Sequence, residues 1–346
     1  MRLGMLLKYS GAPNSLHLEE VLEAERLGYD SVWSGEAYGT DAVTPTAWIL
    51  ARTTRIRAGT GIMQMSARTP ACTAMTALTL QALSNNRLLL GIGASGPQVV
   101  EGWHGMPFGK PMARTREYID ILRKILRRDA PLQHQGELYQ IPYAGPDATG
   151  LGRPLKSILH GDPDMPIYAA SITPIGLRTA GEVADGVLPI FMSPEKADLI
   201  TKPLRQGIAR RPPGGNRPPF DIAPYVRICM GNDLQACRDA LKPEMALYIG
   251  GMGARAKNFY NDFIKHFGYA DAAVKIQDAY LGGRRSEAIA AVPDALVDEC
   301  SLVGSPDHIK DRLQAWKEAS KRDEVGSLLL SGVTIDSLRM VAEAVL

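Results

Sequence analysis

The chain has 346 residues, of which 45% are hydrophobic, and it carries 39 lysines and arginines against 37 aspartates and glutamates. A net charge of +2 gives no electrostatic case for binding nucleic acid or an anionic membrane surface, and the apolar fraction is too high for a disordered chain. The length suits either two average domains or one large α/β barrel.

Strand-like and helix-like segments alternate through the first 128 residues. Apolar runs predict four strands, at residues 2–9, 30–36, 55–63 and 87–94. Helical spacing of apolar residues, with Pro or Gly at the ends, predicts four helices, at residues 16–27, 44–52, 70–84 and 113–128. Residues 129–165 interrupt this alternation with many Gly, Pro and Asp, so we expect an insertion there.

The alternation resumes in the second half of the chain. We expect strands at residues 166–171, 186–191, 220–230 and 326–333. We expect helices at residues 174–183, 194–209, 306–320 and 335–345, and an exposed Pro- and Gly-rich loop at 210–219. Residues 234–301 are mostly helical but too long for one crossover, which predicts a second insertion at about 250–300.

Eight strand–helix units without a dividing linker predict a single α/β domain, residues 1–346, folded as a (β/α)8 TIM barrel with these two insertions. A doubly wound open sheet is the alternative. The first seven residues turn polar at Lys8, too early for a signal peptide, and no apolar run reaches the ~18 residues that span a bilayer. Four cysteines without a C-x-x-C pair are typical of reduced thiols, so we expect a cytoplasmic protein.

Glycines gather at the ends of the third and fourth predicted strands. Residues 91–96 fit G-x-G-x-x-G, but they follow the fourth strand and lead into a segment too short for the helix that a Rossmann site needs. Residues 59–63 (GTGIM) end the third strand, where glycine marks either a close ligand approach or a simple strand end. In a barrel, this end of the strands is the active face.

Polar residues follow other strands at the same expected end. Residues 169–174 (AASITP) join the fifth strand to a helix and predict either an anion site at the helix N-terminus or plain capping by Ser171 or Thr173. Glu36 ends the second strand, and His104 lies in the loop after the fourth. No pair of histidines has metal-ligand spacing, and we expect no metal site.

Three segments, residues 28–33, 54–62 and 87–93, resemble the bacterial-luciferase-like superfamily in order and spacing. Residues 95–105 resemble a subgroup of F420-dependent oxidoreductases from actinobacteria. The resemblance covers nearly the whole chain. It implies a TIM barrel with a long insertion, usually a dimer, and a flavin or deazaflavin at the carboxyl ends of the strands.

The resemblance also implies which residues hold the cofactor. In relatives, a non-proline cis peptide at the end of the third strand supports the tricyclic ring, and it maps onto Gly61–Ile62, followed by Met63. Relatives hold the phosphate with backbone amides of two turns, which map here onto Ala94, Ser95 and Gly96, and onto Ala170, Ser171, Ile172 and Thr173. Gly93, just before the first turn, is also expected to contact the cofactor.

One departure concerns catalysis. Many F420-dependent relatives have Ser-Asp-His at the end of the second strand, where this chain has Gly35-Glu36-Ala37. A mechanism that uses that histidine as an acid or base therefore does not carry over. Whether Glu36 or His104 takes the role stays open.

The leading hypothesis is an F420-dependent oxidoreductase that transfers a hydride between the deazaflavin and a small organic substrate. The alternatives are an FMN-dependent luciferase-like monooxygenase and a non-catalytic flavin-binding protein. The helix at 70–84 is rich in alanine and predicts a homodimer contact, or else close packing on the barrel. The anionic tail of F420 favours cations at the barrel mouth, where we expect Lys110, Arg114, Arg153 and Lys156.

Overall fold

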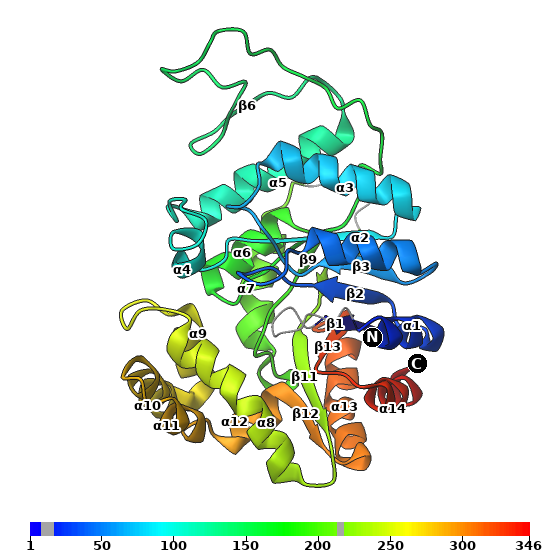
Figure 1. Cartoon of the computed structure of the whole chain (residues 1–346), viewed down its shortest axis with the longest axis vertical. Helices are drawn as coiled ribbons and strands as arrows, with labels where there is room; N and C mark the ends of the chain where they lie inside the picture. Colours follow the sequence, from blue (N-terminus) through cyan, green and yellow to red (C-terminus); the bar gives the residue numbers. More distant parts are fainter. Residues whose placement is uncertain (8–16, 213–217) are drawn as a thin grey trace.

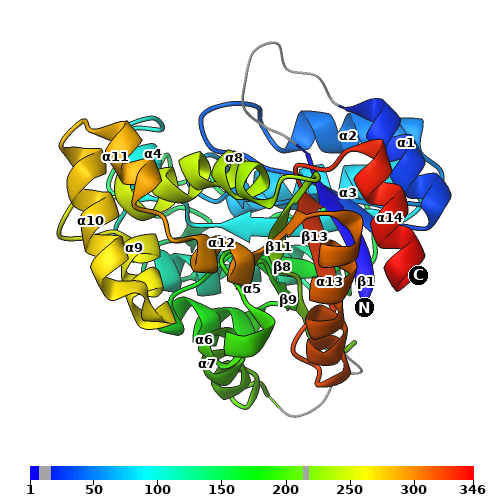
Figure 2. The same ribbon diagram turned by 90° about the horizontal axis from the view of Figure 1, so that it is seen from below.

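The computed structural model describes residues 1–7, 17–212 and 218–346. The predicted strand end at 8–9, the predicted helix start at 16 and the middle of the 210–219 loop lie outside these described residues. A parallel sheet curls on itself and helices surround it (Figures 1 and 2). Its strands follow the order β10-β9-β8-β5-β3-β2-β1-β13-β11-β12, and β4 pairs with β5.

The first half of the barrel follows the predicted alternation. Its strands are β1 (Arg2–Leu6), β2 (Ser31–Ser34), β3 (Arg57–Thr60), β4 (Met63–Gln64) and β5 (Leu88–Gly93). Its helices are α1 (Leu18–Leu27), α2 (Val43–Arg52), α3 (Pro70–Ser84), α4 (Pro97–Val100) and α5 (Pro111–Arg127). The strand predicted at 55–63 is divided into β3 and β4 at the Gly61–Ile62 peptide bond, which is cis.

The second half contains all the predicted strands. They are β8 (Ile167–Ala169), β9 (Gly186–Val187), β10 (Asp221–Ile222), β11 (Tyr225–Met230) and β13 (Ser327–Ser331). The helices between and after them are α6 (Pro174–Val183), η1 (Pro194–Lys196), α7 (Asp198–Ile208), α8 (Leu234–Ala246), α13 (Pro306–Lys321) and α14 (Ile335–Val345).

The count of eight strand–helix units is incomplete, because β12 (Ser301–Gly304) is a further parallel strand beside β11. It follows directly on a helix that ends at Cys300, with no turn residue between them, so the sequence pattern merges the two.

One strand region closes the barrel. Residues 221–230 form β10 and β11, which are separated only by Ala223 and Pro224. β10 pairs with β9 on one side, and β11 pairs with β13 on the other. The Tyr225 amide donates to the carbonyl of Pro189 at 2.9 Å, which holds the two edges together.

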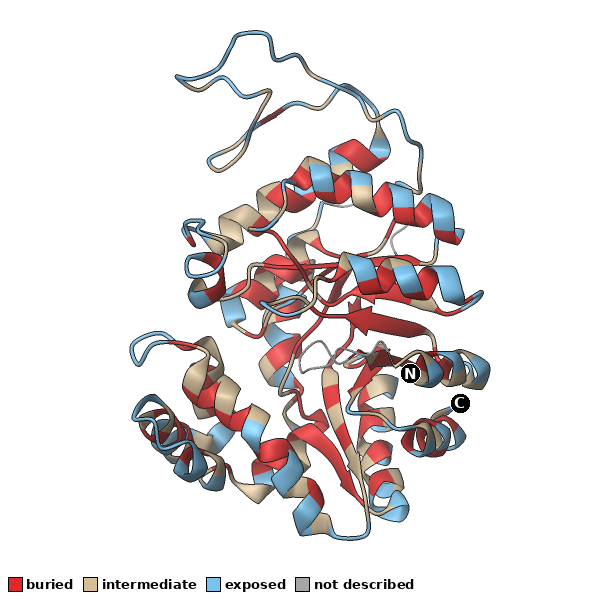
Figure 3. Cartoon of the chain, viewed as in Figure 1, coloured by how far each residue is buried: buried red, intermediate tan, exposed pale blue. Residues whose placement is uncertain are grey.

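The two segments predicted as insertions differ in structure. The first, after α5, contains only the short antiparallel pair β6 (His134–Gln135) and β7 (Gln140–Ile141). The rest of it is irregular, and it projects from the barrel as a largely exposed segment (Figures 1 and 3). The second is helical, and its elements are η2 (Leu247–Gly251), α9 (Phe259–Ile264), η3 (Lys265–Tyr269), α10 (Ala270–Leu281), α11 (Arg285–Ala290) and α12 (Asp294–Cys300).

Large side chains fill the barrel lumen, and glycine makes room for them. Trp33, Leu89, Tyr168, Leu188, Ala223 and Leu329 form a buried cluster separate from the main core. A Cβ atom at Gly59 would lie 2.5 Å from the Trp33 ring. Gly59 therefore serves interior packing, as alternate large and small residues do in barrels. Among the described residues, no helix is long and apolar enough to cross a membrane.

Candidate functional site

Three predicted segments meet at the carboxyl end of neighbouring strands. β3, β5 and β8 lie side by side, and residues 61–63, 93–96 and 170–173 lie at or directly after their ends. The amide of Ala170 donates to the carbonyl of Ile92 at 3.0 Å, and the amide of Met65 donates to the carbonyl of Gly93 at 3.1 Å. The structure thus brings the predicted segments together at one mouth of the barrel.

The backbone of Gly61 is hydrogen-bonded on both sides of its Cα atom. Its amide donates to the carbonyl of Ser34 at 2.7 Å. Its carbonyl accepts a hydrogen bond of 3.0 Å from the hydroxyl group of Tyr225, which is 164 residues away in the sequence. Sequence reasoning missed Tyr225, because no local pattern links a tyrosine on one strand to a carbonyl on a non-adjacent strand.

The loop after β5 makes a tight bend. Ser95 has a φ of 58°, and Gly96 caps the four-residue helix α4. The backbone amide of His104 donates to the carbonyl of Val99 at 3.0 Å, which anchors the following turn. The Nε2 atom of His104 is buried and has no hydrogen-bond partner within the described part of the chain.

At the start of α6, Thr173 acts as the N-cap. Its hydroxyl accepts a hydrogen bond of 3.1 Å from the Gly176 amide, so one of the two predicted capping residues takes this role. The positive end of the ten-residue helix points to the same barrel mouth, because α6 follows β8 directly.

The carboxylate of Glu36 is buried and is held by several hydrogen bonds. Its side chain is 7% exposed, and Arg68 Nη1 lies 3.2 Å from each carboxylate oxygen. The amide of Ala42 donates to Oε2 at 2.9 Å, and the amide of Gln64 is 3.4 Å from Oε1. This carboxylate therefore joins the loop after β2 to β4.

Gln64 is a second buried polar residue that sequence reasoning missed. It is 0% exposed, and its Nε2 atom donates to the carbonyl of Ala37 at 2.8 Å. Its Oε1 atom is buried without a hydrogen-bond partner among residues 1–7, 17–212 and 218–346. A glutamine two residues after the GTGI motif is the only sequence signal, and it is weak by itself.

The structure changes the interpretation of the four basic residues predicted at the barrel mouth. Lys110 pairs with Glu137, and Arg114 donates to the carbonyls of Pro107 and Phe108 at 3.0 and 3.1 Å. The expectation that Arg153 and Lys156 lie at the mouth is wrong. Leu155, which lies between them, accepts a hydrogen bond of 2.8 Å from the amide of Leu132. Leu132 follows the C-terminal end of α5, and in a barrel that end of a helix lies opposite the mouth.

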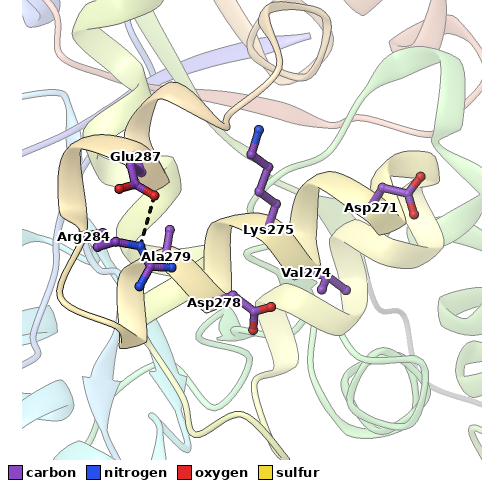
Figure 4. Close-up of a pocket in the computed structure, with 7 residues that line it drawn as sticks. All are labelled: Asp271, Val274, Lys275, Asp278, Ala279, Arg284 and Glu287. Atoms are coloured by element: carbon purple, nitrogen blue, oxygen red, sulfur yellow. Dashed lines mark hydrogen bonds and ion pairs between the residues drawn. The ribbon is translucent and has the colours of Figure 1, made fainter.

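A surface depression of about 400 Å³ lies elsewhere, along α10 and the start of α11 (Figure 4). Its wall has charged groups that pair with one another or with neighbours: Arg284 with Glu287 at 3.0 Å, and Asp278 with Arg255. None of the predicted site residues lines it. The candidate site at the barrel mouth is therefore separate from this depression. Within the described ranges, no group of three or more His, Cys, Asp or Glu side chains is arranged to hold a metal ion.

Comparison with solved structures supports the barrel. The chain superposes on the coenzyme F420-dependent tetrahydromethanopterin reductase of Methanopyrus kandleri with a TM-score of 0.78 at 20% identity, covering 99% of this chain and 98% of that one. It superposes on an F420-dependent secondary alcohol dehydrogenase with a TM-score of 0.74 at 16% identity, covering 99% and 98%. At these identities the likeness shows the fold.

Sequence comparison gives a nearer relative. The chain is 43% identical over 321 residues, 92% of each protein, to a Mycobacterium tuberculosis protein provisionally named as a coenzyme F420-dependent oxidoreductase. It is 26% identical over 329 residues, 93% of this chain and 92% of the relative, to a 5,10-methylenetetrahydromethanopterin reductase of Archaeoglobus fulgidus. The model of the luciferase-like monooxygenase family matches residues 2–322. The chain therefore belongs to the luciferase-like monooxygenase family.

Proposed function

We propose that this protein is an F420-dependent oxidoreductase, which transfers a hydride between the deazaflavin and a small organic substrate. The observation that carries the proposal is the meeting of residues 61–63, 93–96 and 170–173 at one barrel mouth. The 43% identity to a relative named for the same cofactor supports it.

The polar groups at this mouth fit a ligand of that chemistry. Backbone amides in the bend at 94–96 and at the start of α6 suit a phosphate group. Gln64 Oε1 and His104 Nε2 are buried polar atoms without a partner in the described residues, as expected where a ligand supplies the missing hydrogen bonds. When bound, the deazaflavin supplies the ring carbon that gives or receives the hydride.

For the proton that accompanies the hydride, we propose His104 over Glu36. Arg68 and the Ala42 amide engage the Glu36 carboxylate, so taking up a proton there would weaken those contacts. His104 Nε2 is buried and makes no such contact within the described residues, so it is available to a bound substrate. Glu36 then acts as a positioning residue for the loop after β2.

The protein also assembles as a homodimer in this proposal, through α3. Its sequence contains no charged residue, and Ala74 and Ala77 are buried against the barrel. On the outer face, Met75 is 64% exposed and Leu83 is 79% exposed, so the uncharged helix presents two large apolar side chains to solvent. A second copy that covers this face would remove both from water.

Sedimentation velocity at micromolar concentration tests the dimer. The wild type should sediment as a dimer, and Met75→Lys/Leu83→Lys should shift it to a monomer, because each charge would be buried in the contact. Val274→Lys on α10, where the native side chain is 47% exposed, is the control that should stay dimeric. A monomeric wild type would overturn this part of the proposal.

Parallel titrations with F420 and FMN test the cofactor. We expect tighter binding of F420 and hydride transfer to at least one member of a panel of alcohols, ketones and enones. Tighter FMN binding, with rapid oxygen consumption by the reduced cofactor, would favour the monooxygenase alternative. Binding of F420 without hydride transfer to any panel member would favour the non-catalytic flavin-binding protein.

A further inference from the structure

We infer that Tyr225 is a positioning residue for the cofactor: its hydroxyl group fixes the Gly61 carbonyl across the barrel lumen and fills the space that a side chain at position 61 would need. The inference rests on the proposed function, because it takes residues 61–63 as the surface against which the deazaflavin ring lies. It adds a residue from the far wall of the barrel to that surface.

The backbone of Tyr225 is fixed from both sides. Its amide donates to the carbonyl of Pro189 at 2.9 Å, and in the sheet register it lies opposite Leu329 of β13. The strands β13, β1 and β2 separate β11 from β3 in the sheet. The side chain therefore reaches Gly61 through the lumen, and the contact ties together two walls of the barrel that share no strand pairing.

The contact leaves no room for a larger residue at position 61. A Cβ atom built on Gly61 would lie 2.2 Å from the Tyr225 hydroxyl oxygen, which is far inside van der Waals contact. The next atoms are Tyr225 Cζ at 3.3 Å and Trp33 Cβ at 3.4 Å. The hydroxyl group alone therefore accounts for the severe part of the clash.

The chemistry of the hydroxyl group suits a permanent hydrogen-bond donor. Burial raises the pKa of Tyr225 well above that of an ordinary tyrosine, so the phenol is a proton donor at neutral pH. The Gly61 amide is held separately by Ser34. Ser34 thus holds the peptide unit before the Gly61 Cα atom, and Tyr225 holds the Gly61–Ile62 unit after it.

Tyr225→Phe removes the hydroxyl group and keeps the ring. We expect roughly 3- to 10-fold weaker F420 binding, the effect of one buried hydrogen bond that orders a ligand surface. Tyr29→Phe is the matched control, since the Tyr29 hydroxyl also donates to a buried backbone carbonyl, that of Leu338, at 3.0 Å. The control should lose stability and keep its F420 affinity.

A double variant separates this inference from a merely structural role. Gly61→Ala should weaken F420 binding more than Tyr225→Phe does, because the methyl group meets the hydroxyl oxygen. Gly61→Ala/Tyr225→Phe should bind F420 more tightly than Gly61→Ala, because the nearest remaining atom is 3.3 Å away. The same rescue should occur in the melting temperature of the cofactor-free protein, which needs no bound cofactor.

The outcomes are distinguishable. If the wild type binds F420 and the two substitutions add without rescue, the inference is overturned and the proposed function stands. If Tyr225→Phe and Tyr29→Phe leave F420 affinity equally unchanged, the inference is also overturned. If the wild type does not bind F420 at all, the proposed function fails, and the positioning role fails with it.

Discussion

The two ends of the barrel lumen use a tyrosine hydroxyl in different ways. At the base, Tyr168 donates to Asp221 Oδ2 at 2.8 Å, and Ser327 and Arg2 reach the same oxygen at 2.9 and 2.7 Å. At the mouth, Tyr225 donates to a backbone carbonyl in the segment next to the proposed cofactor.

This difference separates stability from function within one lumen. The base contacts join the first residues of several strands to one carboxylate, so they serve the fold. Both ends have buried polar atoms without a partner in the described chain: Asp221 Oδ1 at the base, and Gln64 Oε1 and His104 Nε2 at the mouth. Only at the mouth is a bound ligand expected to offset that cost. Substitutions at the two ends should therefore affect different measurements.

The largest expected effect is at the mouth. Gly61→Val should abolish measurable F420 binding, because a β-branched side chain enters the space of the Tyr225 hydroxyl group. Fluorescence titration of the purified variant gives the affinity, and circular dichroism confirms that it is folded. Unchanged affinity in a folded variant would show that this assignment of the site is wrong.

A substitution at the base of the lumen should lower the free energy of unfolding and leave F420 binding nearly unchanged. Asp221 is 6% exposed, so Asp221→Ala leaves Tyr168, Ser327 and Arg2 without their acceptor, and we expect a loss of about 3 kcal/mol in the free energy of unfolding. Urea denaturation measures the loss. The F420 affinity of the folded variant should stay within about 2-fold of the wild type, and a strongly weakened affinity would contradict the separation of the two ends.

Two substitutions at the mouth should affect different quantities, one the rate of hydride transfer and the other the affinity for F420. His104→Gln should lower the rate of hydride transfer about 100-fold, the lower limit for loss of a general acid or base, with little change in F420 affinity. Glu36→Gln, the comparison variant, should change the rate much less and alter the affinity instead. A larger rate loss for Glu36→Gln would exchange the two roles.

The smallest effect is expected outside the lumen, at an ion pair between η1 and α13. Burial raises the pKa of Glu195, but hydrogen bonds from Arg312 and Ser193 outweigh it and bring the pKa to about 2. Because the folded-state pKa is lowered, the stabilisation is present above about pH 4.5 and is lost as the pH falls towards 2.

Glu195→Gln should therefore cost only a few tenths of a kcal/mol at neutral pH, since the carboxylate is half exposed. The difference in unfolding free energy between variant and wild type should shrink as the pH falls from about 4.5 through about 2. A difference that does not change with pH would show that the ion pair is not its cause.

Regular segments with clear ends could be predicted from the sequence. Proline at the first turn marks the start of α3 and of α6, and an apolar periodicity marks α14, so all three have their predicted bounds. Short strands are less well bounded: the prediction for 186–191 contains β9, which is Gly186–Val187 only. β12 is missed because its four buried residues follow a helix without a turn.

The site could be predicted only where it is local in sequence. The glycine-rich strand ends and the turn before α6 carry their own signals, and the fold places them together. No local sequence signal marks Tyr225, Gln64 or the Arg68–Glu36 ion pair, because their roles depend on contacts between segments distant in the chain. The predicted position of Arg153 and Lys156 at the mouth is wrong for the same reason, since the sequence of an irregular insertion does not indicate where its residues lie relative to the barrel.

The most direct test of the account is a crystal structure of the protein with F420 bound. We predict that the deazaflavin ring lies against residues 61–63, with Tyr225 still donating to the Gly61 carbonyl and the phosphate at residues 94–96 and 170–173. F420 bound away from this mouth, for example in the depression along α10 and α11, would contradict the account.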